Sequence, residues 1–207
     1  GVQNMSAIPI QSSNLAAKDL GFPDPFSGSA GWTQRYGNEP VSQFHGAEMI
    51  AEKWGISRED MEEFAIGSHG KARAAQAAGR FDSEIAPIAG VLADEGPRVP
   101  NREKIASLKP LTEGGRITAA VASQISDGSA ALLVAAERAL KEHGLTPRAR
   151  IHHVSGRGAD PIIMLTAPIP ATEYALKRSG MTLDDIDLVE INEAFASVVL
   201  AWLAETH

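Results

Sequence analysis

Two polar residues interrupt a long apolar stretch in the last twenty residues of the chain. Asn192 and Glu193 follow the short apolar run at 187–191 and precede an uncharged run that ends at Leu203. An amide and a carboxylate in such surroundings can bind a ligand at the mouth of a buried unit. They can equally act as helix caps, because Asn is a favoured N-cap and Glu suits the first turn of a helix.

The surrounding pattern predicts the elements that would position this pair. We expect residues 187–191 to form a buried strand and residues 194–203 to form a helix. The second run is apolar on nearly every side, and a helix apolar all round is buried. Asn192 and Glu193 would then lie at the carboxyl end of a strand, where open α/β sheets bind ligands.

Apolar spacing predicts several helices upstream. Residues 42–54 repeat apolar side chains at i, i+3 and i+4, with Gly55 as the expected stop. Ser57 and Asp60 have the spacing of a capping box and predict a helix over 57–79. Further helices are expected at 101–110, at 126–140 and at 167–180, where two prolines stand at the start.

The other segments are expected to be strands or irregular chain. Small apolar residues at 116–123 predict a buried strand, and residues 149–159 predict another. Residues 81–100 suggest short strands around turns, and residues 11–41, rich in Gly, Ser, Asn and Pro, suggest an irregular excursion. The strand–helix–strand–helix order from Arg150 onward indicates a parallel or mixed sheet covered by helices, which is the α/β fold class.

The composition limits the classes of function. The 207 residues are 43% hydrophobic, enough for a sizeable core in one domain or one and a half. A net charge of -7 argues against a nucleic-acid binder with a broad basic face. No apolar run reaches the roughly 20 residues of a membrane span. We therefore expect a cytoplasmic protein with neither nucleic acid nor membrane as a partner.

The chain contains no cysteine, which excludes a disulfide, a Cys-ligated metal and a Cys nucleophile within these 207 residues. His152 and His153 are neighbours on an expected strand, so their side chains point to opposite faces and cannot ligate one metal together. We expect no metal site. Because the chain lacks an initiator Met and ends at its most apolar helix, we also expect it to be a fragment of a longer protein.

Several motifs resemble those of the thiolase family. The Asn-Glu-Ala-Phe sequence at 192–195 is similar to a thiolase signature, and residues 118–128 (TAAVASQISDG) resemble the family's Thr-Ala-x-x-Ala-Ser-x-x-x-Asp-Gly motif. Residues 1–6 resemble the end of the Gly-Gly-x-Glu-x-Met-Ser segment. Residues 47–81 resemble the covering loop domain, and residues 167–171 resemble the Gly-Pro-x-Pro-Ala helix start. These motifs follow the family's order over nearly the whole chain.

The resemblance implies a partial thiolase-like fold of the α/β class. Details at 35–37 and 42–44 look like the branch that acts on bulky, steroid-derived acyl chains. Four segments are expected: the end of the N-terminal half at 1–10, the loop domain at 11–117, the return into the N-terminal half at 118–146, and the first part of the C-terminal half at 147–207.

By resemblance, the parent protein is an acyltransferase that moves an acyl group between a 3-ketoacyl-CoA and CoA, by thiolytic cleavage or the reverse Claisen condensation. That chemistry needs a thiolate nucleophile, an acid/base and donors for the thioester oxygen. In the family, the nucleophilic Cys precedes the matching segment, and the Gly-His-Pro motif and second Cys follow it. The chain alone is therefore expected to be inactive. Acyl-CoA and CoA are the expected partners, no cofactor is expected, and the expected assembly is a homodimer or homotetramer.

The resemblance also assigns roles to eight residues. Asn192 would be catalytic, by positioning a water that donates to the thioester oxygen. Arg98 would bind the CoA phosphates, although a solvated loop arginine is the equal alternative. The other substrate-binding residues would be Ala119, Ala122 and Ser123 along the pantetheine arm, and Met164, Ala194 and Phe195 at the acyl pocket.

Two other interpretations remain open at this stage. The first is a non-catalytic thiolase-like protein that binds acyl-CoA without turnover, which the absence of cysteine also fits. The second is a helical and α/β scaffold without a ligand, which would leave the motifs as coincidences.

Overall fold

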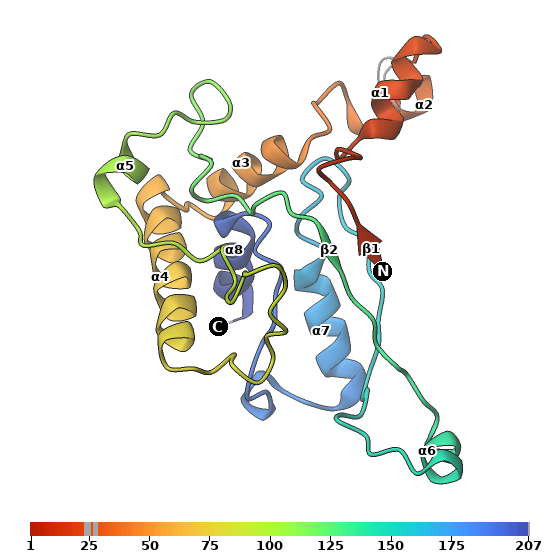
Figure 1. Cartoon of the computed structure of the whole chain (residues 1–207). Coiled ribbons are helices and arrows are strands. Elements are labelled where there is room, and N and C mark those ends of the chain that lie inside the picture. Colours follow the sequence, from red (N-terminus) through yellow and green to blue (C-terminus); the bar gives the residue numbers. More distant parts are fainter. Residues whose placement is uncertain (23–25, 27–28, 207) are drawn as a thin grey trace. The chain divides into compact units, whose positions relative to one another are not determined.

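The computed structural model describes residues 1–22, 26 and 29–206 (Figure 1). Part of the expected irregular excursion at 11–41, and the last residue of the chain, lie outside the described residues. The chain forms two compact units: residues 1–38, 125–156 and 173–182 make up the first unit, and residues 39–124, 157–172 and 183–207 make up the second unit.

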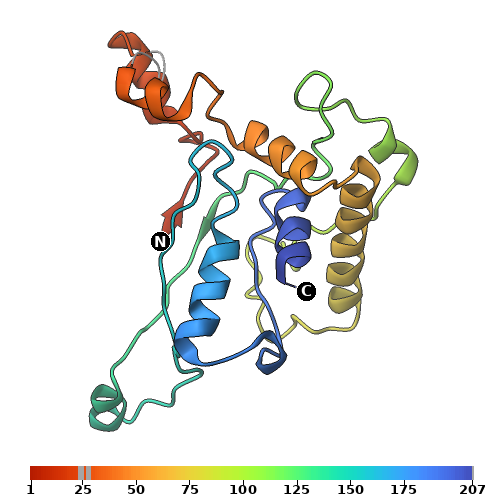
Figure 2. The same cartoon turned by 180° about the vertical axis from the view of Figure 1, so that it is seen from behind.

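Three helices form the centre of the second unit. They are α3 (Gln43–Lys53), α4 (Arg58–Ala77) and α8 (Ala196–Thr206), and α8 packs against both of the others (Figures 1 and 2). The helix expected at 42–54 is confirmed, and the Ser42 side chain caps it by accepting a hydrogen bond from the Phe44 amide. The uncharged helix near the C-terminal end is confirmed as well, and it is buried over most of its length.

The capping box at the start of α4 is also confirmed. The Ser57 hydroxyl accepts from the Asp60 amide at 3.0 Å, and the Asp60 carboxylate accepts from the Ser57 amide at 2.9 Å. Two hydrogen bonds from Ser57 hold the pKa of Asp60 below its ordinary value. The bond from the Ser57 side chain has the larger effect, and the bond from its backbone adds to it. Gly55 follows α3 with a φ of 64°, so the expected helix stop uses a left-handed backbone that suits glycine.

Apolar side chains from α3, α4, α8 and the 117–121 segment meet in one core. Ile50, Met61 and Ile117 are fully buried there. Ser197 on α8 is a buried polar residue, and its hydroxyl donates to the Ala47 carbonyl at 3.1 Å, which satisfies it inside the core. The other buried members of this cluster are Ala47, Ala51, Ile56, Val121, Phe195, Ala196, Val198 and Ala201.

The segment at 116–123 is buried only at Ile117, Thr118 and Val121, and the prediction of a strand there is wrong. The Glu48 carboxylate accepts the amides of Arg116 and Ile117, each at 2.6 Å, so a side chain replaces a neighbouring strand. The chain then turns, with the Val121 amide donating to the Thr118 carbonyl. Within these eight residues, all of them described, only Ala122 forms a bridge, and its partner is Phe195.

The strand expected at 187–191 is not formed either. The structure describes all five residues and assigns no strand to them, and Leu188 is 89% exposed. A strand needs a hydrogen-bonding neighbour, and no described segment supplies one here. Because α8 begins at Ala196, Asn192 is not its N-cap, and the capping interpretation of Asn192 is wrong.

The first unit contains a two-residue antiparallel pairing between β1 (Val2–Gln3) and β2 (Gly128–Ser129). The helix expected at 126–140 is wrong at residues 126–136, and only α6 (Glu137–His143) forms. The Asp127 carboxylate accepts from the Ser6 hydroxyl at 2.6 Å and from the Ser6 amide at 2.9 Å, so it does not cap a helix. These two bonds hold the pKa of Asp127 below its ordinary value, and the bond from the Ser6 hydroxyl has the larger effect.

Two helices, α1 (Ser12–Asp19) and α2 (Ala30–Tyr36), form within the expected irregular excursion. The helix expected at 167–180 is confirmed as α7 (Pro168–Ser179). Residues 149–159 are described throughout and contain no strand, contrary to expectation. The remaining elements are α5 (Arg102–Ala106), close to the helix expected at 101–110, and a 3-10 helix at Leu183–Asp185.

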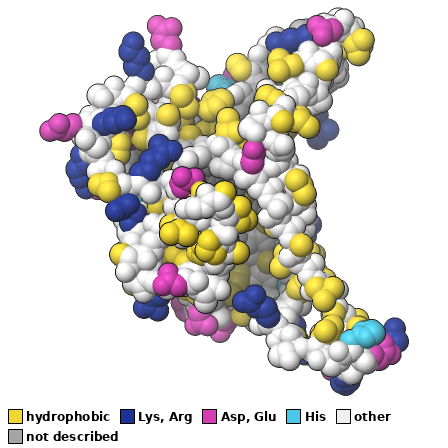
Figure 3. Space-filling view, in the orientation of Figure 1, with side chains coloured by type: hydrophobic (Ala, Val, Ile, Leu, Met, Phe, Trp, Pro, Cys, Tyr) yellow, Lys and Arg dark blue, Asp and Glu magenta, His cyan; other side chains and the backbone are white. Residues whose placement is uncertain are grey.

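Hydrophobic side chains are exposed along the extended chain between β2 and α6 (Figure 3). Leu132 is 92% exposed and Leu133 is 83% exposed. None of the helices within the described ranges is both long enough and apolar enough to cross a bilayer.

Candidate functional site

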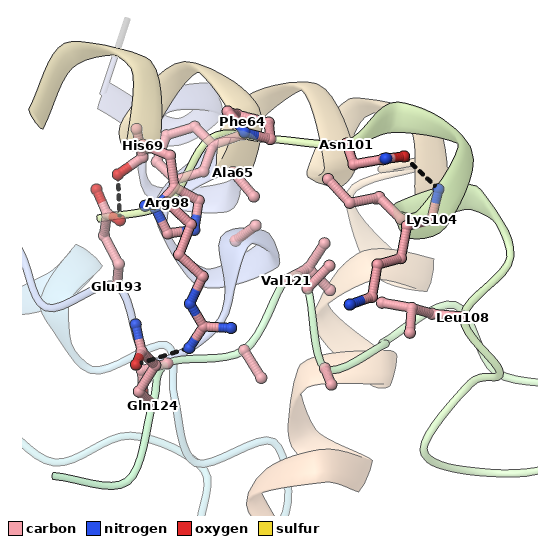
Figure 4. Close-up of a pocket in the computed structure, with 18 of the residues that line it drawn as sticks. Phe64, Ala65, His69, Arg98, Asn101, Lys104, Leu108, Val121, Gln124 and Glu193 are labelled. Carbon is pink, nitrogen blue, oxygen red and sulfur yellow. Dashed lines mark hydrogen bonds between the residues drawn. The ribbon is translucent and has the colours of Figure 1, made fainter. Parts of the chain in front are cut away.

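A cavity of about 490 Å³ opens within the second unit, between α4, α5 and two loop segments (Figure 4). Its volume lies in the usual range of small-molecule sites. Five of the eight residues expected at a site line it: Arg98, Ala119, Ala122, Ser123 and Asn192. The structure therefore brings together residues that lie up to 94 positions apart in the sequence.

Arg98 lies on a turn that several side chains hold in place. Its guanidinium donates to the Gln124 side-chain oxygen at 3.0 Å, and its amide donates to Nδ1 of His69 on α4 at 3.3 Å (Figure 4). Upstream in the same turn, the Asp94 carboxylate accepts from the Gly96 amide at 2.8 Å. Arg98 is thus exposed to solvent yet tied to the cavity at both its backbone and its tip.

A second cation, Lys104, reaches the cavity from α5. The Asn101 side chain caps this short helix by accepting from the Lys104 amide at 2.8 Å (Figure 4). The Lys104 side chain points into the cavity toward Val121 (Figure 4). Two positive charges on separate elements favour an anionic ligand.

α5 is held against α4 by two arginines. The Arg58 guanidinium donates to the carbonyls of Ile105, Ala106 and Leu108 at 3.2, 3.0 and 2.9 Å, and so caps the C-terminal end of α5. Arg102 forms an ion pair with Glu63 on α4. These contacts fix the wall of the cavity that carries Lys104.

The small residues at 119–123 form another wall. The Ser123 amide donates to the Ala194 carbonyl at 2.9 Å, and the Ala196 amide donates to the Val121 carbonyl at the same distance. These bonds hold the segment beside the start of α8. Since the side chains of Ala119 and Ala122 end at Cβ, a slender ligand can approach the backbone closely here.

Asn192 and Glu193 are exposed at the edge of the cavity. The Glu193 carboxylate accepts from the Ser68 hydroxyl on α4 at 2.9 Å (Figure 4). This bond ties the loop before α8 to α4 and so places Asn192 in the same cavity as Arg98 and Ser123.

Three expected site residues do not line this cavity. Phe195 is 4% exposed and packs edge-on against Phe44 with ring centroids 5.6 Å apart. Ala194 is half-buried beside the core, and its carbonyl is the acceptor for Ser123. Met164 lies next to Gly46 of α3, where the chain at 163–164 approaches the helix backbone. Their assignment to an acyl pocket stays a prediction.

Sequence reasoning did not select Lys104, Gln124, His69 or Ser68. Lys104 is one lysine in the helix expected at 101–110, and His69 is a single histidine in the helix expected at 57–79. Their positions follow from contacts between α4, α5 and the loops, which no local pattern encodes.

Family models match almost the whole chain. The thiolase N-terminal domain matches residues 1–138, and the thiolase C-terminal domain matches residues 145–206. The chain belongs to the thiolase family. The expected family, read from the motifs, is confirmed.

Curated thiolases agree with this assignment. The chain is 57% identical to a steroid 3-ketoacyl-CoA thiolase of Mycobacterium tuberculosis over 99% of its own length and 51% of that protein. It is 42% identical to an acetyl-CoA acetyltransferase of Cupriavidus necator over 97% of its length and 54% of the relative. This thiolase chain therefore spans about half the length of the curated relatives it matches.

Solved thiolase structures share the fold. Human mitochondrial 3-ketoacyl-CoA thiolase in complex with CoA matches with a TM-score of 0.71 and 40% identity, over 78% of this chain and 42% of that one. The acetyl-CoA acetyltransferase of Bacillus anthracis matches with a TM-score of 0.74 and 40% identity, over 81% and 46%. The chain thus has part of the α/β thiolase fold, although most of its described regular structure is helical.

Proposed function

We propose that this chain supplies the CoA-binding wall and the thioester-orienting amide of a thiolase that transfers an acyl group between a 3-ketoacyl-CoA and CoA. The observation that carries the proposal is the single cavity in which Arg98, Ser123 and Asn192 meet. A cation, a hydroxyl and an amide line it together with the small side chains of Ala119 and Ala122. CoA is a long thiol with phosphates at one end, so it needs a cation for the phosphates and room for a slender arm, and this cavity offers both.

Each group has a physical role in the proposal. Arg98 and Lys104 bind phosphate oxygens through charge-assisted hydrogen bonds. Ala119 and Ala122 leave room for the pantetheine arm, and Ser123 offers it a hydroxyl. Asn192 orients a water that donates to the thioester oxygen as negative charge develops there.

The remaining parts of the proposal concern the whole protein. The steroid thiolase relative at 57% identity supports a bulky acyl chain as the substrate. CoA takes part as a substrate, with no separate cofactor, in a cytoplasmic homodimer or homotetramer. The proposed division of the chain is the end of the N-terminal half, the loop domain, the return and the first part of the C-terminal half, as expected from the sequence.

A second candidate function is binding of acyl-CoA without turnover. The observation that favours it is the absence of cysteine from all 207 residues, because thiolysis needs a thiolate nucleophile. Both candidates require CoA to bind in the cavity, and they differ in whether a catalytic Cys joins it in the whole protein.

The test is isothermal titration of the chain with CoA. We expect Arg98→Ala to weaken CoA binding by roughly tenfold or more, since a charge-assisted hydrogen bond to a phosphate is lost. The matched control is Arg138→Ala, which removes the same charge from α6 in the other unit, where the arginine pairs with Glu142. Equal affinity of wild type and Arg98→Ala, or no binding of CoA by the wild type, would overturn the proposal.

A further inference from the structure

We propose that Gln124 is a positioning residue that holds the Arg98 guanidinium toward the phosphates of the ligand. The inference rests on the proposed function, because it assumes that Arg98 meets an anion in the cavity. It goes beyond that function by assigning a role to a residue outside the expected site.

Gln124 bridges two parts of the turn that carries Arg98. Its side-chain oxygen accepts from Nη2 of Arg98 at 3.0 Å, and its side-chain nitrogen donates to the Gly96 carbonyl at 3.3 Å (Figure 4). One amide group therefore fixes the tip of the arginine relative to the backbone that supports it.

The backbone of this turn has other anchors. The Gln76 side chain on α4 donates to the Asp94 carbonyl at 3.0 Å, and His69 accepts from the Arg98 amide. These two contacts fix where the turn lies. The Gln124 oxygen accepts from the end of the arginine side chain, so orientation of the guanidinium is the property that depends on it.

A neutral amide suits this task better than a carboxylate. A guanidinium carries five N–H donors, and one amide oxygen leaves most of them for a phosphate. A carboxylate in the same place would also hold the arginine, but its negative charge would weaken the attraction between the guanidinium and a phosphate. Orienting a flexible side chain before binding lowers the entropy lost on binding, which raises affinity.

The position of Gln124 in the chain links Arg98 to the small-residue segment of the cavity. It directly follows Ser123 in the segment held beside α8, which is anchored through the amide of Ser123 and the carbonyl of Ala194. The segment that would contact the slender arm of the ligand thus also orients Arg98, the cation that would contact the anionic end of the ligand.

The experiment is a double-mutant cycle on the chain, with CoA affinity measured by isothermal titration. Gln124→Met keeps the length of the side chain and removes both hydrogen bonds. We expect it to weaken CoA binding about three- to tenfold, the range for one exposed hydrogen bond. In the Arg98→Ala background the same change should have no further effect, because Gln124 acts through Arg98.

Three further measurements separate positioning from a general effect. Gln124→Glu should weaken CoA binding at least as much as Gln124→Met, although its carboxylate can still hold the arginine. Binding of pantetheine, which has no phosphate, should be the same in wild type and Gln124→Met. Gln34→Met on α2 makes the same chemical change in the other unit and should leave CoA affinity unchanged.

The outcomes distinguish this inference from the proposed function. If Arg98→Ala weakens CoA binding while Gln124→Met does not, or if the two effects add, Gln124 does not position Arg98 and the proposed function stands. If Gln124→Met weakens pantetheine as much as CoA, its role is structural and the inference is wrong. If the wild-type chain binds no CoA, the proposed function and this inference both fall.

Discussion

The polar residues of the cavity differ in the part of the proposed ligand that they would contact. Cations would bind its phosphates, and an amide would act at its thioester oxygen. Arg98 and Lys104 are cations on a turn and on α5. Asn192 is an amide at the edge of the same cavity, in the loop that the bond between Glu193 and Ser68 ties to α4. Because Asn192 does not cap α8, its amide is not committed to helix formation.

Asn192 gives a prediction at this scale. In an intact thiolase that contains this sequence, Asn192→Ala should lower kcat by about 10²-fold or more, because one donor to the developing oxyanion is lost. The affinity for CoA should change little, since the phosphates lie against Arg98 in the proposal. The measurement is steady-state kinetics of thiolysis with CoA varied.

The matched control is Glu190→Gln, which changes an exposed residue just before the loop. It should leave kcat unchanged. An Asn192→Ala enzyme with wild-type kcat would remove this amide from the mechanism.

Part of the lining of this cavity follows from the sequence because short motifs contain the residues. Arg98, Ser123 and Asn192 were each found by resemblance, and the structure places all three in one cavity. The partners that hold them were not predicted, since Gln124 is 26 residues from Arg98 and Ser68 is 125 residues from Glu193. Contacts over such separations leave no periodic pattern in the sequence.

At the scale of elements, prediction succeeded where structure depends on neighbours in the sequence. The limits of α3, α4 and α7 follow from caps, glycines and prolines within one turn of their ends. The expected strands failed because a strand needs a distant partner, and in the second unit the Glu48 carboxylate and the turn at 118–121 satisfy the backbone instead.

Two helix glycines give an element-scale prediction. A Cβ added at Gly46 of α3 would lie 2.8 Å from the Ile163 carbonyl oxygen, whereas one added at Gly70 of α4 would meet nothing within 4 Å. Gly46→Ala should therefore lower the free energy of unfolding by about 1–3 kcal/mol through overpacking. Gly70→Ala should raise it by about 0.5–1 kcal/mol through helix propensity.

Urea denaturation followed by circular dichroism measures both variants, and Gly70→Ala serves as the control for the propensity that alanine adds. If Gly46→Ala were as stable as Gly70→Ala, the close approach of the 163–164 chain to α3 would be wrong.

At the scale of the whole chain, length and composition decide what it can do alone. It spans about half of its curated relatives, and it has a cavity of about 490 Å³ but no cysteine. The proposed function therefore separates binding from covalent catalysis in this sequence, because CoA binding would need cations and small side chains while acyl transfer needs a thiolate.

This separation predicts the behaviour of the isolated chain. Purified alone, it should bind CoA in the titration described above, yet show no thiolysis of a 3-ketoacyl-CoA above the uncatalysed rate. The measurement is loss of the 3-ketoacyl-CoA at increasing chain concentration, with an intact thiolase as the positive control. A rate that rises in proportion to the chain would show that a residue other than cysteine acts as the nucleophile.

The packing of α8 has a spectroscopic consequence. The Trp202 indole on α8 is 5% exposed and donates to the Thr172 hydroxyl at 2.9 Å, and the Trp54 indole donates to Glu205 at the end of the same helix at 2.8 Å. The chain has three tryptophans in all, and the third, Trp32, belongs to the other unit. Intrinsic fluorescence of this protein is therefore weighted toward one helix, and α8 carries its own optical reporter without any added label.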